Sequence, residues 1–183
     1  MSNKIWEFTG ETKIHFGVTL RRIRAAVEFK LKCGIVIVKG ELGGWIEKES
    51  NLSGNAWVSD NAEVSGNAEV SDNARVFDDA WVSGNAWVSG NARVSGNARV
   101  SGNAMVFGDA WVKSSKDYCV YKNTWSSFRW FTYTLSNKMW SDGCFYGTGA
   151  ELISKAYKDS EKSGKCYEAI VKAQEEIEKA MEV

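Results

Sequence analysis

The chain has 183 residues, 44% of them hydrophobic and 25% charged, which is typical of a globular protein and excludes a disordered one. Its 23 basic and 23 acidic residues balance, and this argues against binding to bulk nucleic acid, which requires many unpaired cations. No apolar run approaches the roughly 18 residues needed to cross a bilayer, so no membrane association is expected.

The four cysteines show no CxxC spacing, and the only histidine is His15. Neither pattern supports a metal site, and no motif in the sequence indicates a cofactor. The first residues carry acidic and polar side chains early and do not resemble a secretory signal. We therefore expect a cytoplasmic protein with reduced thiols.

Residues 1–50 are expected to form a β-rich cap, with strands at 14–20 and 35–38. The turns before the segment 45–47 are predicted at three glycines, Gly40, Gly43 and Gly44. Three arginines follow the first predicted strand: Arg21, Arg22 and Arg24. They form either salt bridges with Glu7, Glu11 or Glu28, or a patch that binds anions.

From Leu52 a six-residue unit recurs with the pattern aliphatic, Ser/Phe, Gly/Asp, Asn/Asp, Ala, variable. Since alternate residues of a strand face opposite sides, the alanine and the aliphatic residue point inward and the variable residue points outward. Gly, Asn and Asp accept a positive φ and supply the corners. Three such sides close one coil of ~18 residues, so residues 51–113 are predicted to form a left-handed parallel β-helix.

Stacking of residues eighteen apart predicts three columns of outward side chains. Side one consists of Trp57, Arg75, Arg93 and Trp111, with Phe77 beside Arg75. Side two consists of Glu63, Trp81 and Arg99, and side three of Glu69, Trp87 and Met105, with Phe107 beside Met105. Large exposed rings usually mark contacts, so these columns are an oligomer interface, a surface packed under the chain's own ends, or a ligand surface.

Residues 114–183 are expected to form a β-hairpin and two helices, an α+β appendage on a mainly β fold. The strands are predicted at 119–121 and 125–135, with a short strand at 143–147. A capping box of Thr148 and Glu151 begins a helix that ends near residue 157. The second helix is predicted to bury Cys166, Ile170, Ala173, Ile177 and Met181, as part of its own core or as an oligomer seam.

Several segments resemble an uncharacterised family of phage and prophage proteins with GNA-type hexapeptide repeats, often described as polymer-forming. The segments are 6–13, 19–25, 40–49 and the tail motif 143–148. This chain departs from the family at Ser163-Gly164, where other members often carry a His-Gly turn. The resemblance implies a phage or prophage origin and supplies no catalytic residues.

The Trp and Arg columns, together with the host setting that the resemblance implies, predict a non-enzymatic binding protein that acts in the cytoplasm of a host cell. It would sequester an anionic, nucleotide-like signal or block a host defence protein. The predicted binding residues are Trp57, Arg75, Phe77, Arg93 and Trp111, with Arg21, Arg22 and Arg24. The predicted interface of a homo-oligomer, most simply a trimer, comprises Trp81, Trp87, Met105 and Phe107. The alternatives are a structural or assembly protein of a virion or filament, and an acyltransferase, which would need a loop-borne histidine.

Overall fold

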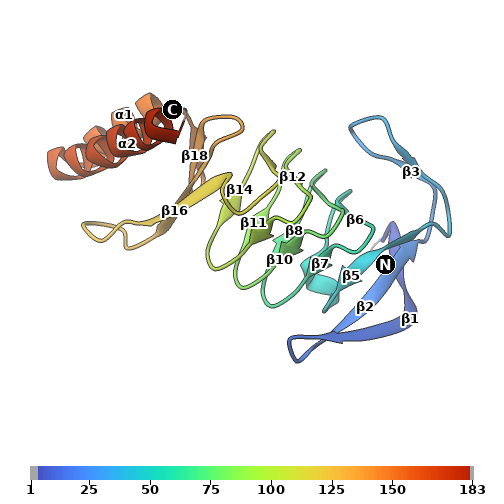
Figure 1. Cartoon of the computed structure of the whole chain (residues 1–183). Helices are drawn as coiled ribbons and strands as arrows, with labels where there is room; N and C mark the ends of the chain where they lie inside the picture. The colour runs from blue at the N-terminus through green and yellow to red at the C-terminus, as the bar shows by residue number, and fades with distance from the viewer. Residues whose placement is uncertain (1–3, 182–183) are drawn as a thin grey trace.

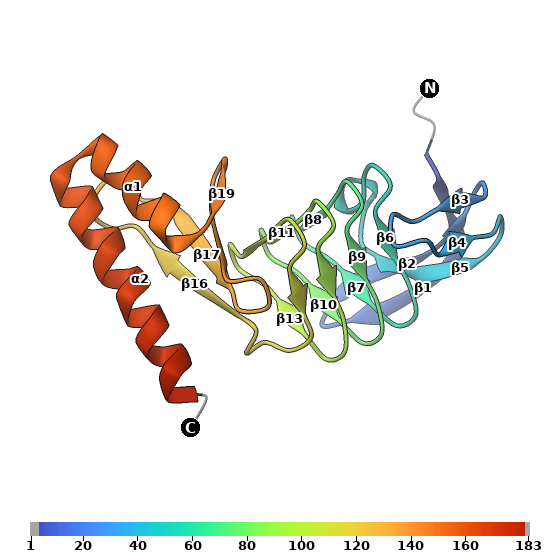
Figure 2. The same cartoon turned by 90° about the horizontal axis from the view of Figure 1, so that it is seen from above.

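The computed structural model describes residues 4–181 and shows a mainly β protein with two helices at its C-terminal end. The N-terminal elements are β1 (Trp6–His15), β2 (Val18–Ala25), β3 (Phe29–Lys30), β4 (Val36–Ile37), β5 (Leu42–Ile46) and the short helix η1 (Glu49–Asn51). The C-terminal elements are β16 (Tyr118–Lys122), β17 (Trp130–Thr134), β18 (Met139–Asp142), β19 (Phe145–Gly147), α1 (Gly149–Asp159) and α2 (Glu161–Met181). Figure 2 shows these two groups at opposite ends of an elongated body.

Between the two ends the chain coils into a parallel β-solenoid, as the repeat predicts. Its strands are β6 (Trp57–Val58), β7 (Glu63–Val64), β8 (Glu69–Val70), β9 (Arg75–Val76), β10 (Trp81–Val82), β11 (Trp87–Val88), β12 (Arg93–Val94), β13 (Arg99–Val100), β14 (Met105–Val106) and β15 (Trp111–Val112). Every third strand pairs in parallel, which gives the ladders β6-β9-β12-β15, β7-β10-β13 and β8-β11-β14. The three predicted columns are confirmed, while the handedness of the coil stays a prediction.

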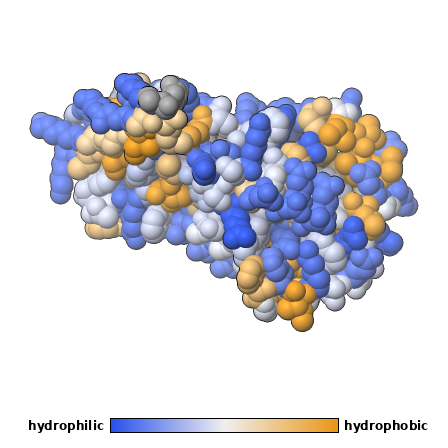
Figure 3. All heavy atoms as spheres, viewed as in Figure 1, coloured by the Kyte–Doolittle hydropathy of each residue, from blue (hydrophilic) through white to orange (hydrophobic). Residues whose placement is uncertain are grey.

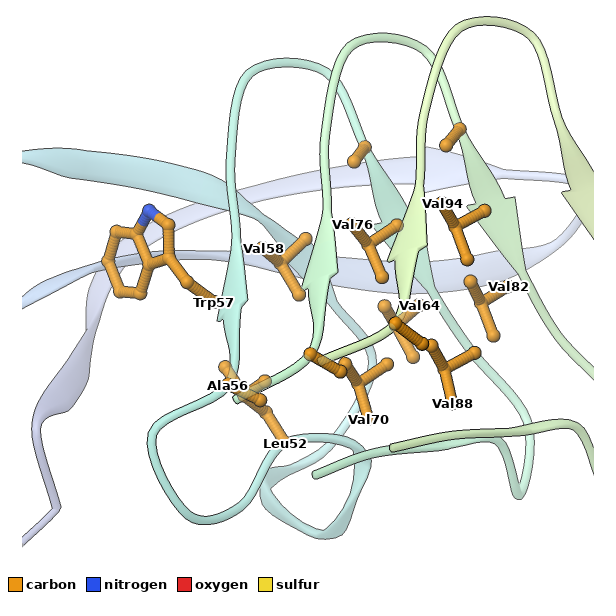
Figure 4. Close-up of a cluster of buried hydrophobic side chains, with 14 of the residues drawn as sticks. Leu52, Ala56, Trp57, Val58, Val64, Val70, Val76, Val82, Val88 and Val94 are labelled. Carbon is orange, nitrogen blue, oxygen red and sulfur yellow. The ribbon is translucent and has the colours of Figure 1, made fainter. Parts of the chain in front are cut away.

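The interior of the solenoid is filled by the repeated alanines and valines. From Ala56 to Val112 these side chains are at most 1% exposed. Figure 4 shows the valines of successive coils in rows, with Trp57 pointing away from them. Such a narrow interior has no room for a larger side chain at the alanine positions.

The corners of the coils are made by glycine or aspartate in the left-handed region of backbone conformation. Gly84 has a φ of 70° and Asp78 a φ of 60°. Asp78 also links two coils, since its Oδ2 accepts a hydrogen bond of 2.9 Å from the backbone N–H of Gly96 in the next coil. The repeat thus uses two residue types at its corners, which tolerate the same conformation for different reasons.

The N-terminal cap differs from the sequence-based prediction at two places. The segment 14–20 is not one strand, because Phe16 (φ 47°) and Gly17 (φ 78°) form the turn between β1 and β2. Gly43 and Gly44 were predicted in turns, but both lie inside the strand β5. A Cβ on Gly44 would lie 2.7 Å from the carbonyl oxygen of Ala62, so glycine is required there by close backbone approach.

The cap joins the solenoid through β5, which pairs in parallel with β7. The ladder of side two therefore extends into a six-stranded sheet of order β1-β2-β5-β7-β10-β13. The strands β3 and β4 form a separate antiparallel hairpin. This hairpin packs against side one, where Phe29 meets Trp57, and so the cap contributes to two faces of the coil.

The C-terminal end is a four-stranded antiparallel sheet covered by two helices. The strand order is β16-β17-β18-β19, and the predicted capping box of Thr148 and Glu151 begins α1. The predicted core face of α2 is wrong, because Ala173, Ile177 (48%) and Met181 (60%) are exposed, and Cys166 and Ile170 are only partly buried. The buried residues of α2 are Ser163, Gly164, Tyr167, Val171 and Gln174.

The buried face of α2 is rotated from the predicted one, because the helix packs with Tyr167 against aromatic side chains of the C-terminal sheet and of the loop before β17. The ring of Tyr167 packs on Phe131 and Trp125, and its hydroxyl donates to the carboxylate of Asp142. Gln174 accepts a hydrogen bond from the Tyr121 hydroxyl at 2.5 Å. Neither helix of the described chain is long and apolar enough to span a membrane.

Candidate functional site

Side one is built on the ladder β6-β9-β12-β15. The register pairs Trp57 with Arg75, Arg75 with Arg93, and Arg93 with Trp111. Neighbouring strands of a ladder lie about 4.8 Å apart, so the two guanidinium groups emerge from adjacent coils on the same face. The sheet places them together because the repeat carries arginine twice at the same outward position.

The first coil of side one is covered by the β3–β4 hairpin. Trp57 is only 1% exposed, and the Phe29 ring meets it edge-on with centroids 5.4 Å apart. Leu31 and Ile37 of the same hairpin are buried. The prediction that Trp57 belongs to an open binding surface is corrected, because the hairpin removes this ring from solvent.

The two arginines of side one lie against aromatic rings and a thiol. The guanidinium carbon of Arg75 is 4.8 Å from the Phe77 ring centroid, and that of Arg93 is 5.6 Å from the Trp111 centroid. Nη1 of Arg75 donates to Sγ of Cys33 at 3.5 Å, while Nε of Arg75 is buried without a hydrogen-bond partner among the residues that the structure describes. Within residues 4–181, neither Arg75 nor Arg93 forms a salt bridge.

A cavity of about 160 Å³ opens between these arginines and the β3–β4 hairpin. Its lining residues are Lys32, Cys33, Asn73, Arg75, Asn91, Arg93 and Asp109. The lining contains three cationic side chains and one acidic side chain. Asp109 is held at the edge by Asn91, whose Nδ2 donates to Oδ1 of Asp109 at 2.8 Å. The cavity therefore carries an excess of positive charge.

Trp111 forms the open end of side one. Its side chain is 38% exposed, and its Nε1 donates to Oγ of Ser95 at 2.9 Å. The ammonium group of Lys113 lies 4.0 Å from the ring centroid. The hydrogen bond and the cation fix one side of the indole, so an exposed part of the ring is held in a defined orientation beside Arg93.

The thiol of Cys33 is part of the same cavity and was missed by the sequence analysis. Desolvation raises its pKa, but the hydrogen bond from the backbone of Ile35 and the charges of Arg75 and Arg93 outweigh this and hold the pKa below its ordinary value. Cys33 lies 42 residues before Arg75 in an irregular segment. No spacing in the sequence could have placed the two together.

The three arginines of the cap that were predicted to extend the binding surface of side one, Arg21, Arg22 and Arg24, lie elsewhere. Arg22 and Arg24 are on β2 and form salt bridges with Glu11 at 3.3 Å and Glu7 at 2.7 Å, as one of the two sequence-based alternatives stated. Arg21 lies over the ring of Phe8 at 5.4 Å. These arginines belong to the sheet that includes side two, so they do not extend the cavity beside Arg75.

Side two is partly covered by the turn between β1 and β2. The Phe16 ring stacks on Trp81 at 5.2 Å with an interplanar angle of 7°, and His15 lies against the same indole. Nδ1 of His15 is paired with the Glu63 carboxylate. Lys13, His15, Glu63, Trp81 and Arg99 are among the residues that line a second cavity, of about 220 Å³.

Side three keeps the most open aromatic surface of the three. Trp87 is 42% exposed and meets Phe107 edge-on with centroids 4.8 Å apart. Met105 and Trp130, the latter from β17, line the same shallow depression of about 330 Å³. Figure 3 shows a further gathering of hydrophobic surface over the C-terminal helices.

The C-terminal sheet does not cover side one, and this answers a question that the sequence left open. Trp140 of β18 is buried in the core of the C-terminal part, and Trp125, in the loop before β17, packs on Phe131 and Tyr167. The sheet instead meets the last coil end-on, where Met105 N–H donates to Oγ1 of Thr132 at 2.8 Å. The C-terminal sheet therefore leaves side one uncovered from Arg75 to Trp111, although the β3–β4 hairpin contacts Arg75.

Comparison with known proteins identifies the repeat alone. Residues 68–84, 86–101 and 98–114 match a family model described as the YdcK β-solenoid repeat. The matched residues lie within the solenoid and its last corner, and they include Arg75, Arg93 and Trp111. No curated protein matches the chain. The chain is thus a repeat β-solenoid protein with flanking segments that the family model does not describe.

Proposed function

We propose that this chain is a non-enzymatic binding protein whose side one holds a small anion. The observation that carries the proposal is the pair Arg75 and Arg93, which share one cavity and form no salt bridge within residues 4–181. A guanidinium group that is partly removed from water is costly unless an acceptor satisfies it. A bound anion supplies those acceptors.

The ligand that fits this geometry carries a phosphate or carboxylate and a flat ring. Two arginines on adjacent coils present planar donors that match phosphate and carboxylate oxygens in a bidentate manner. The cavity of about 160 Å³ has room for the anionic group and not for a complete nucleotide. The rest of the ligand would lie along the ladder towards Trp111, whose exposed face can stack on a base.

The biological role that suits such a site is sequestration of a nucleotide-like signal inside a host cell. This part of the proposal depends on the resemblance to phage and prophage proteins, which implies that setting. The same exposed surface of Arg93 and Trp111 would also suit an acidic segment of a host defence protein. Ligand and protein partner share one chemistry, an anionic group beside an apolar body.

The proposal is tested by titrating reduced protein with pyrophosphate, AMP and a cyclic nucleotide in a calorimeter. We expect binding that weakens at least tenfold when Arg75→Ala and Arg93→Ala are combined, because each charged hydrogen bond contributes about 1.5–3 kcal/mol. The melting temperature should change little, because both side chains lie outside the alanine and valine interior.

The matched control is Arg99→Ala. Arg99 occupies the same repeat position on side two, and its guanidinium carbon lies 5.8 Å from the centroid of the Trp81 ring. The substitution should leave the affinity unchanged. Equal losses of affinity in the control and in the double variant would show non-specific charge attraction and overturn the proposal. An absence of binding by the wild-type chain to all three probes would also overturn it.

An assembly role is the second candidate, favoured by the open aromatic surface of side three. The two alternative functions from the sequence analysis, an assembly protein and an acyltransferase, can be tested with the same protein preparation. Light scattering distinguishes a discrete oligomer from a filament. Release of coenzyme A thiol from acetyl-CoA would support an acyltransferase, with the pair His15 and Glu63 as the base to mutate first.

A further inference from the structure

Cys33 stands at the wall of the cavity that contains Arg75 and Arg93. Its side chain is exposed, and its Sγ accepts a hydrogen bond from Nη1 of Arg75 at 3.5 Å. Lys32, the preceding residue, lines the same cavity. Three cations therefore surround one accessible thiol, at the mouth of a space large enough for an anionic group.

This surrounding favours the thiolate, which is the reactive form of cysteine. The charges of Arg75 and Arg93 and the hydrogen bond from Ile35 overcome the desolvation that opposes ionisation, so the pKa of Cys33 is below its ordinary value. Cys119 shows the opposite behaviour, because burial raises its pKa. Cys144 is exposed like Cys33, but it lies between β18 and β19 at the other end of the molecule, away from Arg75 and Arg93.

We propose that Cys33 is a modification site that reacts selectively with anionic disulfides, of which glutathione disulfide is the chemical type. The selectivity rests on the anion-binding role proposed for side one. The cations that hold a phosphate in that role would hold the carboxylates of the disulfide and bring its sulfur atoms to the thiol.

The reaction is a thiol–disulfide exchange and needs no further reagent. The Cys33 thiolate attacks one sulfur of the bound disulfide, and the sulfur–sulfur bond of the reagent breaks as the new mixed disulfide forms. The other half leaves as a thiolate and takes up a proton from water. The group attached to Cys33 then fills the cavity and blocks Arg75 and Arg93, so modification switches off anion binding until a thiol reduces the mixed disulfide.

The test compares an anionic with a neutral disulfide on the full chain. One variant keeps Cys33 alone (Cys119→Ser, Cys144→Ser, Cys166→Ser), and its matched control keeps Cys144 alone (Cys33→Ser, Cys119→Ser, Cys166→Ser). Both are treated with the dianionic 5,5′-dithiobis(2-nitrobenzoate) and with neutral 2,2′-dithiodipyridine, and the released thiol is followed by absorbance. Intact mass after treatment with glutathione disulfide identifies the modified residue.

We expect the ratio of anionic to neutral rate constants to be about tenfold higher for Cys33 than for Cys144, since a local excess of positive charge raises the encounter rate of anions by about 10-fold or more. Arg93→Glu in the Cys33 variant should abolish the difference, and pyrophosphate should slow only the anionic reaction. Equal ratios for the two thiols, or a ratio unchanged by Arg93→Glu, would overturn the inference.

The outcome also separates this inference from the proposed function. If reduced wild-type protein binds pyrophosphate while Cys33 shows no preference for the anionic reagent, the modification site is refuted and the binding role stands. If Cys33 prefers the anionic disulfide while pyrophosphate neither binds nor slows the reaction, the cavity attracts anions without holding them. The modification site would then stand and the proposed function would fall.

Discussion

Alanine at the fifth position of each repeat is the residue on which the coil geometry depends. Ala86 is 1% exposed and is enclosed by other alanines and valines of the interior. A side chain with three additional carbon atoms cannot be placed there without moving the backbone of neighbouring coils, because the interior is close-packed. The inward direction of this position follows from the two-residue period of the strands alone.

Replacing Ala86 with leucine is therefore expected to lower the free energy of unfolding by about 1–3 kcal/mol. Glu69→Leu, on the outside of side three, serves as the comparison because Glu69 is exposed and forms no salt bridge within residues 4–181. It should change stability by less than about 0.5 kcal/mol. Urea unfolding of both variants measures this, and similar losses in the two would contradict the assignment of inside and outside.

At the scale of elements, the C-terminal sheet closes the open edge of the last coil. The final strands of the solenoid have backbone N–H groups with no further coil to accept them. Side-chain hydroxyls replace that coil: Oγ1 of Thr132 accepts from Met105 at 2.8 Å, and Oγ of Ser136 accepts from Trp111 at 2.8 Å. An edge satisfied in this way does not offer a template for strand addition.

Thr132→Val tests this cap with little change in shape. Thr132 is fully buried, so the variant leaves the N–H of Met105 without an acceptor and should cost about 1–3 kcal/mol. Thr124→Val, at an exposed loop position, should have almost no effect. Thermal unfolding followed by circular dichroism compares the two, and equal stability of Thr132→Val and wild type would show that the hydrogen bond does not support the cap.

The β3–β4 hairpin is a second element that determines the site, because it covers the first coil of side one. It buries Trp57 through Phe29 and brings Lys32 and Cys33 to the arginines of the later coils. Two short strands of two residues each provide little stability of their own. Their position depends on the buried contacts of Leu31 and Ile37, which are distant in sequence from the repeat.

At the scale of the whole molecule, the exposed aromatic surface of side three predicts association of the chain with itself. Trp87 and Trp130 are 42% and 38% exposed in one continuous depression with Met105. Side two is less suited to this role than the sequence suggested, because Phe16 covers Trp81. A closed ring of copies would bury such a surface without leaving a free one.

We expect a trimer in light scattering at micromolar concentration, and a monomer when Trp87 is replaced by glutamate, because a buried carboxylate is costly. Trp111→Glu, a change of the same kind at a tryptophan of side one with a similar exposure (38%), should leave the mass unchanged. A wild-type chain that is monomeric under these conditions would remove the prediction.

The sequence by itself determined the solenoid. The six-residue period fixes which residues face inward, the Gly or Asp corners fix the turns, and the register of eighteen residues places Arg75 beside Arg93. The capping box of Thr148 and Glu151 could also be predicted from the sequence, because it depends only on residues three positions apart. In each case neighbours in sequence or in the repeat carry the information.

Only the tertiary structure decided which outward residues remain available. Trp57 and Trp111 occupy the same column, yet one is buried under the hairpin and the other is open to solvent. The meeting of Cys33 with Arg75 and the rotated buried face of α2 likewise arise from segments far apart in the chain. The physical reason is that these contacts depend on side-chain packing between irregular segments and a regular coil, and no sequence period records such packing.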